Sequence, residues 1–374
     1  MTHVQQIDTL RQQVLAAAAD KRPLRIRGGG TKDWYGGALS GDILDMRQLS
    51  GIIDYEPTEL VITARSGTPL AEIDAALREH NQMLAFEPPS FGAGATLGGV
   101  VAAGLSGPRR AASGAVRDFV LGAVLMDGRG EVLNFGGQVM KNVAGYDVSR
   151  LLAGSMGTLG VLLQHSIKVL PRPVAEATLR FAASEIDALA RLNTWAGKPL
   201  PVSASSWVDD VLTVRLSGAA AAVDAAIAAF VASFGGERLA PTEADAFWAG
   251  LREQTNPFFT SAGQLWRLSV PSVAGALVLE GEQLIEWGGA QRWLKLPAAA
   301  SAADVSARAS RIRASVRAAG GHATLFRKGD STGDAAIDAG VPVFEPLAPA
   351  IARVHERLKA SFDPAHIFNP GRLF

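Results

Sequence analysis

Short runs with the two-residue period of a β-strand alternate along the chain with segments whose apolar residues recur at helical spacing. Residues 24–27 read Leu-Arg-Ile-Arg, and residues 1–22 place Ile7, Leu10 and Val14 on one helical face. A second helical stripe follows Pro69, a residue that suits a first helical turn. The strands predicted in this half are residues 24–27, 43–45, 60–64, 120–126, 131–135 and 161–170.

The pattern changes after Pro171-Arg172-Pro173, which is typical of a domain boundary. Strands then alternate with alanine-rich helices, and this order predicts an α+β domain in which helices cover an antiparallel sheet. The predicted strands are residues 177–182, 203–208, 212–216, 265–270, 291–296 and 322–326. The predicted helices are residues 184–195, 219–234, 242–253 and 302–319, with a last helix at 346–362 before a tail without regular structure.

Three consecutive glycines, Gly28-Gly29-Gly30, come directly after the first predicted strand. Without side chains, successive N–H groups can turn toward one point and bind an anion such as a pyrophosphate. Arg27 and Lys32 add positive charge beside them, and Thr31 adds a hydroxyl donor. For a glycine triplet that stands alone, a plain tight turn is the better explanation. The dinucleotide fingerprint of Rossmann domains does not fit, since its third glycine position holds Asp33 and no long helix follows.

Two later segments repeat this chemistry. Thr96-Leu97-Gly98-Gly99 lies about seventy residues after the first loop, and residues 154–160 again place glycines and hydroxyl side chains before a predicted strand. Two separated anion-binding loops suit a long dinucleotide better than a single phosphate. For Gly98 and Gly99 alone, close packing of a helix on a strand is the competing explanation.

Composition narrows the function classes. Hydrophobic residues make up 48% and charged residues 19% of the 374, so the chain has enough apolar residues for a sizeable core. The 36 basic and 36 acidic side chains give a net charge of zero, which does not favour nucleic acid or anionic membranes as partners. There is no cysteine, and this excludes disulfides and cysteine-bound iron–sulfur clusters within the chain. No uncharged apolar stretch is long enough for a membrane span.

The order and spacing of these motifs resemble the vanillyl-alcohol-oxidase type (PCMH-type) FAD-binding family. The resemblance rests on residues 25–32, 95–99, 141–147 and 154–160. The N-terminal half is similar to the FAD domains of D-lactate dehydrogenases and of glycolate oxidase flavin subunits. Two further stretches, residues 107–118 and the tail from Phe362 to Arg372, resemble the smaller FAD-binding subunits of bacterial glycolate oxidases. The resemblance covers nearly the whole chain and is weakest between about 175 and 320.

This resemblance implies an α+β fold with a two-lobed, PCMH-type FAD-binding domain at residues 1–172. A smaller α+β cap domain with an antiparallel sheet would follow at 173–330, and a C-terminal helix and tail at 331–374 would return to the FAD domain. It also implies a set of residues that bind FAD. They are Arg27, Gly28, Gly29, Gly30, Thr31, Lys32, Thr96, Leu97, Gly98, Gly99, Ser113, Gly114, Val116, Asn142, Tyr146, Gly157, Gly160, Val161 and Asn369.

The implied activity is that of an FAD-dependent oxidoreductase subunit, in a complex that oxidises glycolate to glyoxylate. The resemblance implies a catalytic flavin subunit and an iron–sulfur subunit as partners. Because the chain has no cysteine, it cannot hold a cysteine-bound cluster, and either oxygen or a partner must take the electrons. The expected location is the cytoplasm, with any contact to the inner membrane peripheral and made through the partners. Three alternatives stay open: a self-sufficient D-2-hydroxy-acid dehydrogenase, a structural assembly subunit whose flavin does not turn over, and an enzyme for another alcohol.

Histidines and arginines bear on how the flavin and substrate are held. No cysteine is present and no histidine lies in the first loop, so we expect FAD to be bound without a covalent link. A lone His322 in a predicted strand does not make a metal site, and none is expected. Catalytic residues remain unknown, with Arg109 and Arg110 as candidate anchors for a substrate carboxylate. Four arginines of the helix at 302–319 would face either a partner or solvent: Arg308, Arg311, Arg313 and Arg317.

Overall fold

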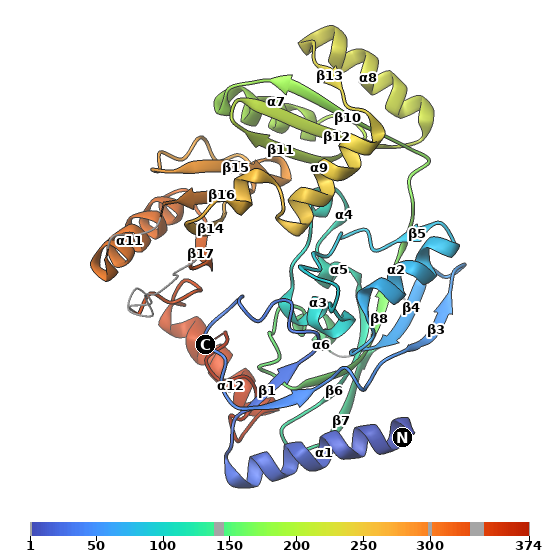
Figure 1. Ribbon diagram of the computed structural model, residues 1–374, viewed down its shortest axis with the longest axis vertical. Coiled ribbons are helices and arrows are strands. Elements are labelled where there is room, and N and C mark those ends of the chain that lie inside the picture. Colours follow the sequence, from blue (N-terminus) through green and yellow to red (C-terminus); the bar gives the residue numbers. More distant parts are fainter. Residues whose placement is uncertain (1, 138–145, 298–300, 330–339, 374) are drawn as a thin grey trace. The chain divides into compact units, whose positions relative to one another are not determined.

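The computed structural model describes residues 2–137, 146–297, 301–329 and 340–373 (Figure 1). The chain divides into two compact units. Unit 1 comprises Met1–Ser106, Gly114–Arg172 and Leu347–Phe374, and unit 2 comprises Gly107–Ser113 and Pro173–Pro346. The chain therefore enters unit 2 briefly at residue 107 and crosses into it again after Arg172.

Unit 1 combines short strands with helices from both ends of the chain. Its elements are α1 (His3–Asp20), β1 (Leu24–Arg27), β2 (Asp42–Asp45), β3 (Ile52–Glu56), β4 (Val61–Arg65), α2 (Leu70–Glu79), β5 (Gln82–Met83), α3 (Leu97–Ala103), α5 (Val116–Phe119), β6 (Val120–Met126), β7 (Val132–Gly136), α6 (Val148–Leu151), β8 (Val161–Lys168), β9 (Leu170–Pro171) and α12 (Pro349–Phe362). Among the described residues, an antiparallel sheet has the order β3-β4-β8-β6-β7, and β1 pairs in parallel with β2.

The segment after α12 pairs with β1 although more than 300 residues separate them in sequence. The N–H of Leu24 donates to the carbonyl of Ile367 at 2.7 Å, and the N–H of Asn369 donates to the carbonyl of Leu24 at 2.9 Å. Figure 1 shows this C-terminal segment, in red, beside the blue β1. The strand that leads into the first glycine loop is therefore held on one side by β2 and on the other by the tail.

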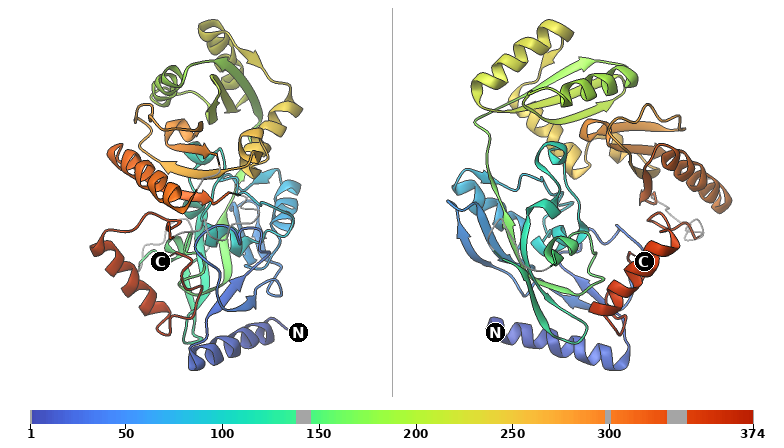
Figure 2. Two further views of the ribbon diagram at one scale, coloured as in Figure 1. Left: turned by 60° about the vertical axis from the view of Figure 1, so that its left-hand side comes forward. Right: turned by 180° about the vertical axis from the view of Figure 1, so that it is seen from behind.

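Unit 2 is built on one long antiparallel sheet with helices packed against it (Figure 2). Its elements are α4 (Arg110–Ser113), β10 (Ala175–Ala182), α7 (Glu185–Ala196), β11 (Val202–Val208), β12 (Val211–Gly218), α8 (Ala220–Phe234), β13 (Glu237–Arg238), α9 (Pro241–Glu253), α10 (Pro257–Thr260), β14 (Gln264–Ser269), β15 (Glu282–Glu286), the 3₁₀ turn η1 (Trp287–Gly289), β16 (Gln291–Leu296), α11 (Ala302–Ala318) and β17 (His322–Arg327). In the described part, the strand order is β13-β10-β12-β11-β15-β16-β14-β17. Helices α7 and α8 pack on β10 and β12, and α11 packs on β14, β16 and β17.

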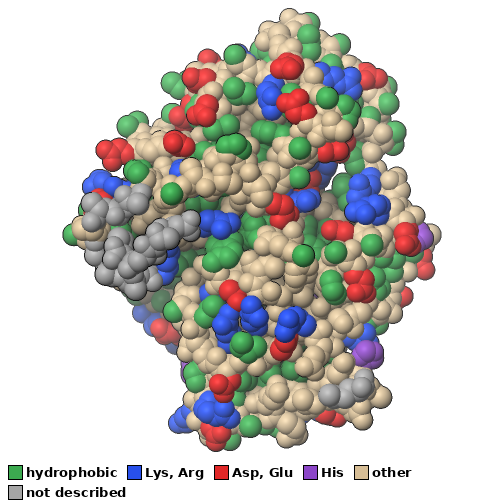
Figure 3. Space-filling model, viewed as in Figure 1, with side chains coloured by type: hydrophobic (Ala, Val, Ile, Leu, Met, Phe, Trp, Pro, Cys, Tyr) green, Lys and Arg blue, Asp and Glu red, His purple; other side chains and the backbone are tan. Residues whose placement is uncertain are grey.

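The surface carries both signs of charge in close mixture. On the face drawn in Figure 3, Lys and Arg side chains lie among Asp and Glu side chains without a large patch of one sign.

Across the described residues, no helix has both the length and the apolarity needed to cross a membrane.

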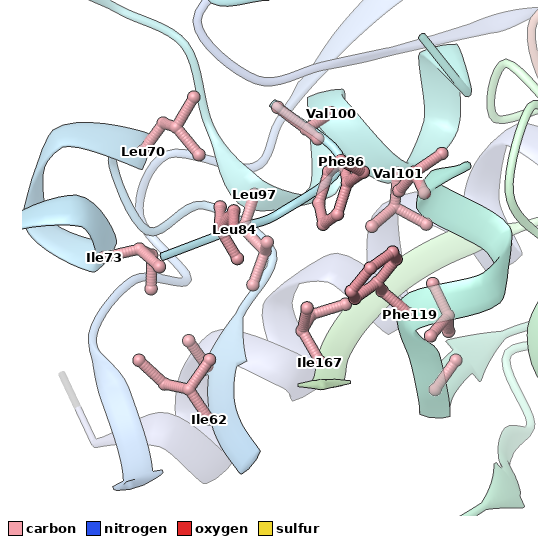
Figure 4. Packing of buried hydrophobic residues seen from close by; sticks show 14 of the residues in the cluster. Ile62, Leu70, Ile73, Leu84, Phe86, Leu97, Val100, Val101, Phe119 and Ile167 are labelled. Atoms are coloured by element: carbon pink, nitrogen blue, oxygen red, sulfur yellow. The ribbon is translucent and has the colours of Figure 1, made fainter. Parts of the chain in front are cut away.

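The core of unit 1 fills the space between its sheet and the helices α2 and α3. Ile62 of β4, Ile73 of α2 and Leu97 of α3 are each fully buried, and they point toward one another in Figure 4. Phe86 and Phe119 meet there with ring centroids 5.2 Å apart. This packing fixes α3, which begins at the second glycine loop, against the strand that precedes α2.

Most elements predicted from periodicity are confirmed within a few residues, and β1, β6 and β16 agree at both ends. Three differences matter. The second glycine loop continues into α3, as the competing explanation for Gly98 and Gly99 anticipated. β3, at the edge of its sheet, and β15, between β11 and β16, are additional strands. The last helix begins at Pro349, three residues later than expected. The antiparallel sheet predicted for the second half is confirmed.

Candidate functional site

The first glycine loop leaves β1 with its backbone donors unpaired. Within the described residues, no protein acceptor receives the N–H groups of Gly28, Gly29, Gly30 or Thr31. The preceding donor on the same side of the strand, the N–H of Ile26, is bound at 2.8 Å by the side-chain oxygen of Asn369. Successive unpaired N–H groups form a nest that suits an anion.

Close contact with a second loop explains why the first loop is made of glycine. A Cβ on Gly29 would lie 1.5 Å from the carbonyl oxygen of Gly94, and a Cβ on Gly28 would lie 2.3 Å from Oγ1 of Thr96. A side chain on Gly29 would displace backbone, and a side chain on Gly28 would displace the side chain of Thr96. The two loops therefore meet backbone to backbone, and a substitution at Gly29 would push them apart.

Charged and hydroxyl groups surround the nest. Thr31 Oγ1 and Lys32 Nζ donate to the carbonyl of Ser90, at 2.7 and 3.2 Å. The Asp33 carboxylate accepts from Arg27 Nε at 2.8 Å and also from Arg25. Asp33, whose charge argued against a Rossmann loop, is thus paired with two guanidinium groups, so its negative charge does not stand alone beside the nest.

The third glycine loop and the C-terminal tail lie beside the first glycine loop and are joined to β1 by hydrogen bonds. The Asn369 side chain accepts from Ile26 and donates to the carbonyl of Met156 at 2.7 Å. A Cβ on Gly157 would lie 2.6 Å from that same amide nitrogen. Asn369 therefore joins β1, the third loop and the tail through its side chain, and its amide is occupied by these internal bonds.

These segments enclose a hollow that lies entirely within unit 1. Its volume is about 590 Å³ when the solvent-filled space at its open mouth is included. It is lined by Ile26, Arg27, Gly28, Gly29, Gly30, Thr31, Lys32, Asp33, Leu39, Thr96, Gly99, Ala102, Ala103, Met156, Asn369 and Arg372. A pyrophosphate accepts hydrogen bonds and is stabilised by positive charge. The hollow offers unpaired N–H groups, a hydroxyl, an ammonium group and guanidinium groups for this purpose.

The structure brings nine of the predicted cofactor residues to this hollow: Arg27, Gly28, Gly29, Gly30, Thr31, Lys32, Thr96, Gly99 and Asn369. Five further predicted residues do not line the hollow and make packing contacts: Gly157, described above, and Leu97, Gly98, Gly160 and Val161. Their role in cofactor binding stays a prediction. Leu97 is fully buried in the core, and a Cβ on Gly98 would lie 2.5 Å from Cβ of Ser66. Val161 is fully buried. A Cβ on Gly160, the residue before it, would lie 2.7 Å from the carbonyl oxygen of Met126.

The remaining predicted cofactor residues do not line the hollow. Gly114 belongs to unit 1 with a φ of +104°, and Val116 is buried in its core, whereas Ser113 belongs to unit 2, where its hydroxyl donates to the carbonyl of Arg109. Tyr146 is 93% exposed. Asn142 lies outside the described residues. The role of these five in cofactor binding stays a prediction.

Sequence reasoning missed several residues of the hollow. Ala102 and Ala103 come from α3, Met156 from the third loop and Arg372 from the tail. Asp33 was noticed only as a departure from another motif. A signal was available for Arg372, because the tail motif around Asn369 was already expected to return to this region.

The two candidate anchor arginines both lie in unit 2 and differ in surroundings. Arg109 is buried, and its guanidinium donates to the carboxylate of Glu176 at 2.5 Å. Arg110 lies over the ring of Trp287, 4.4 Å from the centroid, a cation–π geometry. A substrate carboxylate would have to compete with Glu176 for Arg109. The anchor role of both stays a prediction.

Two further sequence expectations can be placed. His322 is a residue of β17, and burial together with the charge of Arg267 lowers its pKa. Of the four arginines on α11, Arg313 is buried and donates to the carbonyl of Pro342, so it faces neither a partner nor solvent. In the described part of the chain, no cluster of three or more His, Asp and Glu side chains could hold a metal ion.

The sequence of this chain is similar to those of known FAD-binding proteins. A family model described as an FAD binding domain matches residues 2–136. The glycolate oxidase subunit GlcE of Escherichia coli (strain K12) is 48% identical over 365 residues, which is 98% of this chain and 96% of that protein. The chain belongs to the GlcE family of FAD-binding oxidoreductase subunits. Its cofactor is FAD, and the donors of the hollow fit the pyrophosphate of that cofactor.

More distant relatives match only part of the chain. The glycolate oxidase subunit GlcD of Bacillus subtilis (strain 168) is 30% identical over 48% of this chain and 38% of its own length. The D-lactate dehydrogenase of Archaeoglobus fulgidus is 34% identical over 48% of this chain and 41% of its own length. The likeness to GlcE thus extends over the unit 2 sequence as well, whereas these matches span about half of the chain.

Solved structures confirm the predicted fold class. Alkyldihydroxyacetonephosphate synthase aligns with a TM-score of 0.67 at 15% identity, over 97% of this chain and 75% of that one. A p-cresol methylhydroxylase with substrate bound also aligns with a TM-score of 0.67, at 14% identity, over 98% of this chain and 87% of that one. The chain has the PCMH-type FAD-binding fold.

Proposed function

We propose that this protein is the FAD-binding subunit of a glycolate oxidase complex, and that its bound FAD takes part in the oxidation of glycolate to glyoxylate. The observation that carries the proposal is the 48% identity to E. coli GlcE over nearly the full length of both chains. A likeness limited to the fold would leave the substrate open, because one fold serves many reactions. Here the match also includes the parts of unit 2 that lie outside the FAD binding domain.

In this proposal, the N–H groups of residues 28–31 bind the FAD pyrophosphate, and Arg27 and Lys32 balance its charge. FAD supplies the acceptor for the two electrons that glycolate loses, with two protons, on becoming glyoxylate. The chain holds FAD without a covalent bond, since it has no cysteine and no histidine lines the hollow within the described residues. The electrons then leave through a partner subunit of the complex, since this chain has no cysteine with which to ligate an iron–sulfur cluster of its own and its relatives include glycolate oxidase subunits.

The partners we propose are a catalytic flavin subunit and an iron–sulfur subunit of the same complex. The domain roles follow the sequence expectation, with FAD bound by residues 1–172 and the tail, and residues 173–330 as the cap. The complex would work in the cytoplasm, and contact with the inner membrane would be peripheral and made by the partner subunits.

Visible absorbance of the purified chain tests the first part of this proposal. The chain is reconstituted with FAD, desalted, and then mixed with glycolate in the absence of oxygen. We expect the flavin spectrum to survive desalting and to stay oxidised with glycolate, since the other subunits are missing. Loss of flavin on desalting would contradict binding by this chain alone. Bleaching by glycolate would favour a self-sufficient hydroxy-acid dehydrogenase instead.

A second experiment separates a redox role from a purely structural one. Gly29→Val places a side chain against the carbonyl of Gly94, and we expect it to remove FAD. Gly275→Val is the matched control, because a Cβ at Gly275 meets nothing within 4 Å. Complexes assembled with each variant are assayed for glycolate oxidation. A complex that assembles with Gly29→Val, lacks this flavin and keeps full activity would show that the flavin does not turn over.

A further inference from the structure

Arg372 of the tail is buried beneath the segment that follows the first glycine loop. Its guanidinium donates to the carbonyl of Gly37 at 2.6 Å, to that of Asp33 at 3.2 Å and to that of Tyr35. In return, the N–H of Gly37 donates to the carbonyl of Arg372 at 3.0 Å. One side chain thus binds several carbonyls of residues 33–37, the segment that continues directly from the nest.

The segment is shaped to receive the tail. A Cβ on Gly37 would lie 1.8 Å from the carbonyl oxygen of Gly371, and a Cβ on Gly36 would lie 3.1 Å from that of Arg372. Gly36 has a φ of +100°, a conformation that other residues rarely adopt. The contact is therefore specified from both sides: by an arginine on the tail and by two glycines on the loop.

Burial of the Arg372 guanidinium costs free energy, because the charged group loses its contact with water. Burial lowers the pKa of Arg372, and the charge of Asp33 opposes that effect. A buried charge is tolerated when hydrogen bonds satisfy it, and the planar five-donor geometry of arginine can satisfy several carbonyls at once. Lysine has the same charge but not this geometry.

We propose that Arg372 is a positioning residue for FAD: it fixes residues 33–37 and so holds the preceding N–H groups of residues 28–31 converged on the pyrophosphate. The inference deepens the proposed function, because it concerns how this chain keeps its flavin. Without the guanidinium, the loop samples other conformations, and the apparent affinity falls by the fraction of time that the nest is formed. A nest formed about one tenth of the time weakens FAD binding about tenfold.

The test compares Arg372→Gln, Arg372→Lys and Gly37→Ala with the wild type, and Arg353→Gln, on the exposed face of α12, is the control. FAD dissociation constants are measured at several salt concentrations, and hydrogen exchange is measured on the FAD-free proteins. We expect Kd to rise about tenfold or more in all three variants and not in the control. We also expect faster exchange in residues 28–37, with unchanged exchange in the β4 and β8 core.

Salt dependence distinguishes positioning from direct contact with a phosphate. Loss of a cation that touches phosphate reduces the dependence of Kd on salt, and Lys32→Gln provides that reference. For Arg372→Gln we expect the wild-type dependence to remain. An unchanged Kd, or a Kd restored by Arg372→Lys together with a reduced salt dependence in Arg372→Gln, would overturn the inference.

Faster exchange throughout unit 1 would also overturn it, since Arg372 would then only stabilise the fold. Wild-type protein that does not retain FAD would contradict the proposed function instead. In that case, exchange in the FAD-free variants still decides whether Arg372 fixes the loop.

Discussion

Several buried cations in this chain bind backbone carbonyls rather than carboxylates alone. Lys359 donates to the carbonyls of Thr158 and Phe368 as well as to Asp363, and Arg292 donates to those of Ala274, Gly275 and Gly289. Glycine-rich loops expose many carbonyls that no strand or helix satisfies. A long cationic side chain from elsewhere in the chain satisfies them, and in doing so it joins distant segments.

His165 is a buried ionisable group without such partners. It lies on β8 with no exposed surface, and among the described residues neither ring nitrogen has a hydrogen-bond partner. Burial lowers its pKa from the ordinary 6.5 to about 4. Between these two values the unfolded chain binds a proton that the folded chain does not, so stability falls as pH falls through this window.

We therefore expect His165→Leu to remove part of the acid sensitivity of folding. Between pH 7 and pH 4, the wild type should lose about 3 kcal/mol more unfolding free energy than the variant, from a shift of roughly 2.5 units at about 1.4 kcal/mol per unit. Urea unfolding at several pH values measures the difference, with His3→Gln at the exposed N-terminal helix as control. Parallel curves for wild type and His165→Leu would contradict the assigned burial effect.

At the scale of elements, sequence periodicity predicted most of the buried strands, but it missed β15 inside the sheet of unit 2 and β3 at the edge of the sheet of unit 1. β6 is a mostly buried apolar strand, β16 is a buried strand of mixed polar and apolar residues, and both ends of each were predicted correctly. β3 is an edge strand with largely exposed positions, so it lacks a clear two-residue pattern. For α3 the sequence left two explanations open, because glycines near a helix start lower its helix propensity; the structure shows the helix, with Gly98 closely packed on Ser66.

The same distinction applies to the site. Its glycine loops could be predicted because the chemistry is local: each loop carries its own glycines and hydroxyls. The contacts of Arg372 with Tyr35, and of Asn369 with Met156, join residues more than 200 positions apart. No local pattern in a single sequence encodes such pairs, and only the fold reveals them.

Gly98→Ala tests the packing role that the structure gives to this predicted cofactor residue. The added methyl would lie 2.5 Å from Cβ of Ser66 and 2.9 Å from its carbonyl oxygen, so α3 must move away from the end of β4. We expect a loss of roughly 2 kcal/mol of unfolding free energy, typical of overpacking. Ser66→Gly removes part of the clash, and the double variant should recover part of the loss. A fully stable Gly98→Ala protein would show that α3 is free to shift.

At the scale of the whole molecule, the two units have separate hydrophobic cores, and the FAD site that we propose lies within unit 1. The core of unit 1 lies between its five-stranded sheet and α2 and α3, while α7, α8 and α11 cover the sheet of unit 2 in the described part of the chain. A molecule built in this way need not unfold in one step. A ligand that binds one folded unit stabilises that unit by mass action.

Calorimetry with and without FAD should therefore resolve two transitions, of which only one moves with FAD. At a free FAD concentration of about 100 times Kd, the unit that binds it gains about 2.7 kcal/mol. Hydrogen exchange assigns the transitions, because FAD should slow exchange in β1, α3 and the tail and leave β10 to β12 unchanged. The variant Gly29→Val should abolish the shift while retaining the FAD-independent transition at its original temperature. A single transition that moves as a whole with FAD would show instead that the two units unfold together, and that flavin loss then destabilises the unit 2 sheet as much as the loops that hold the cofactor.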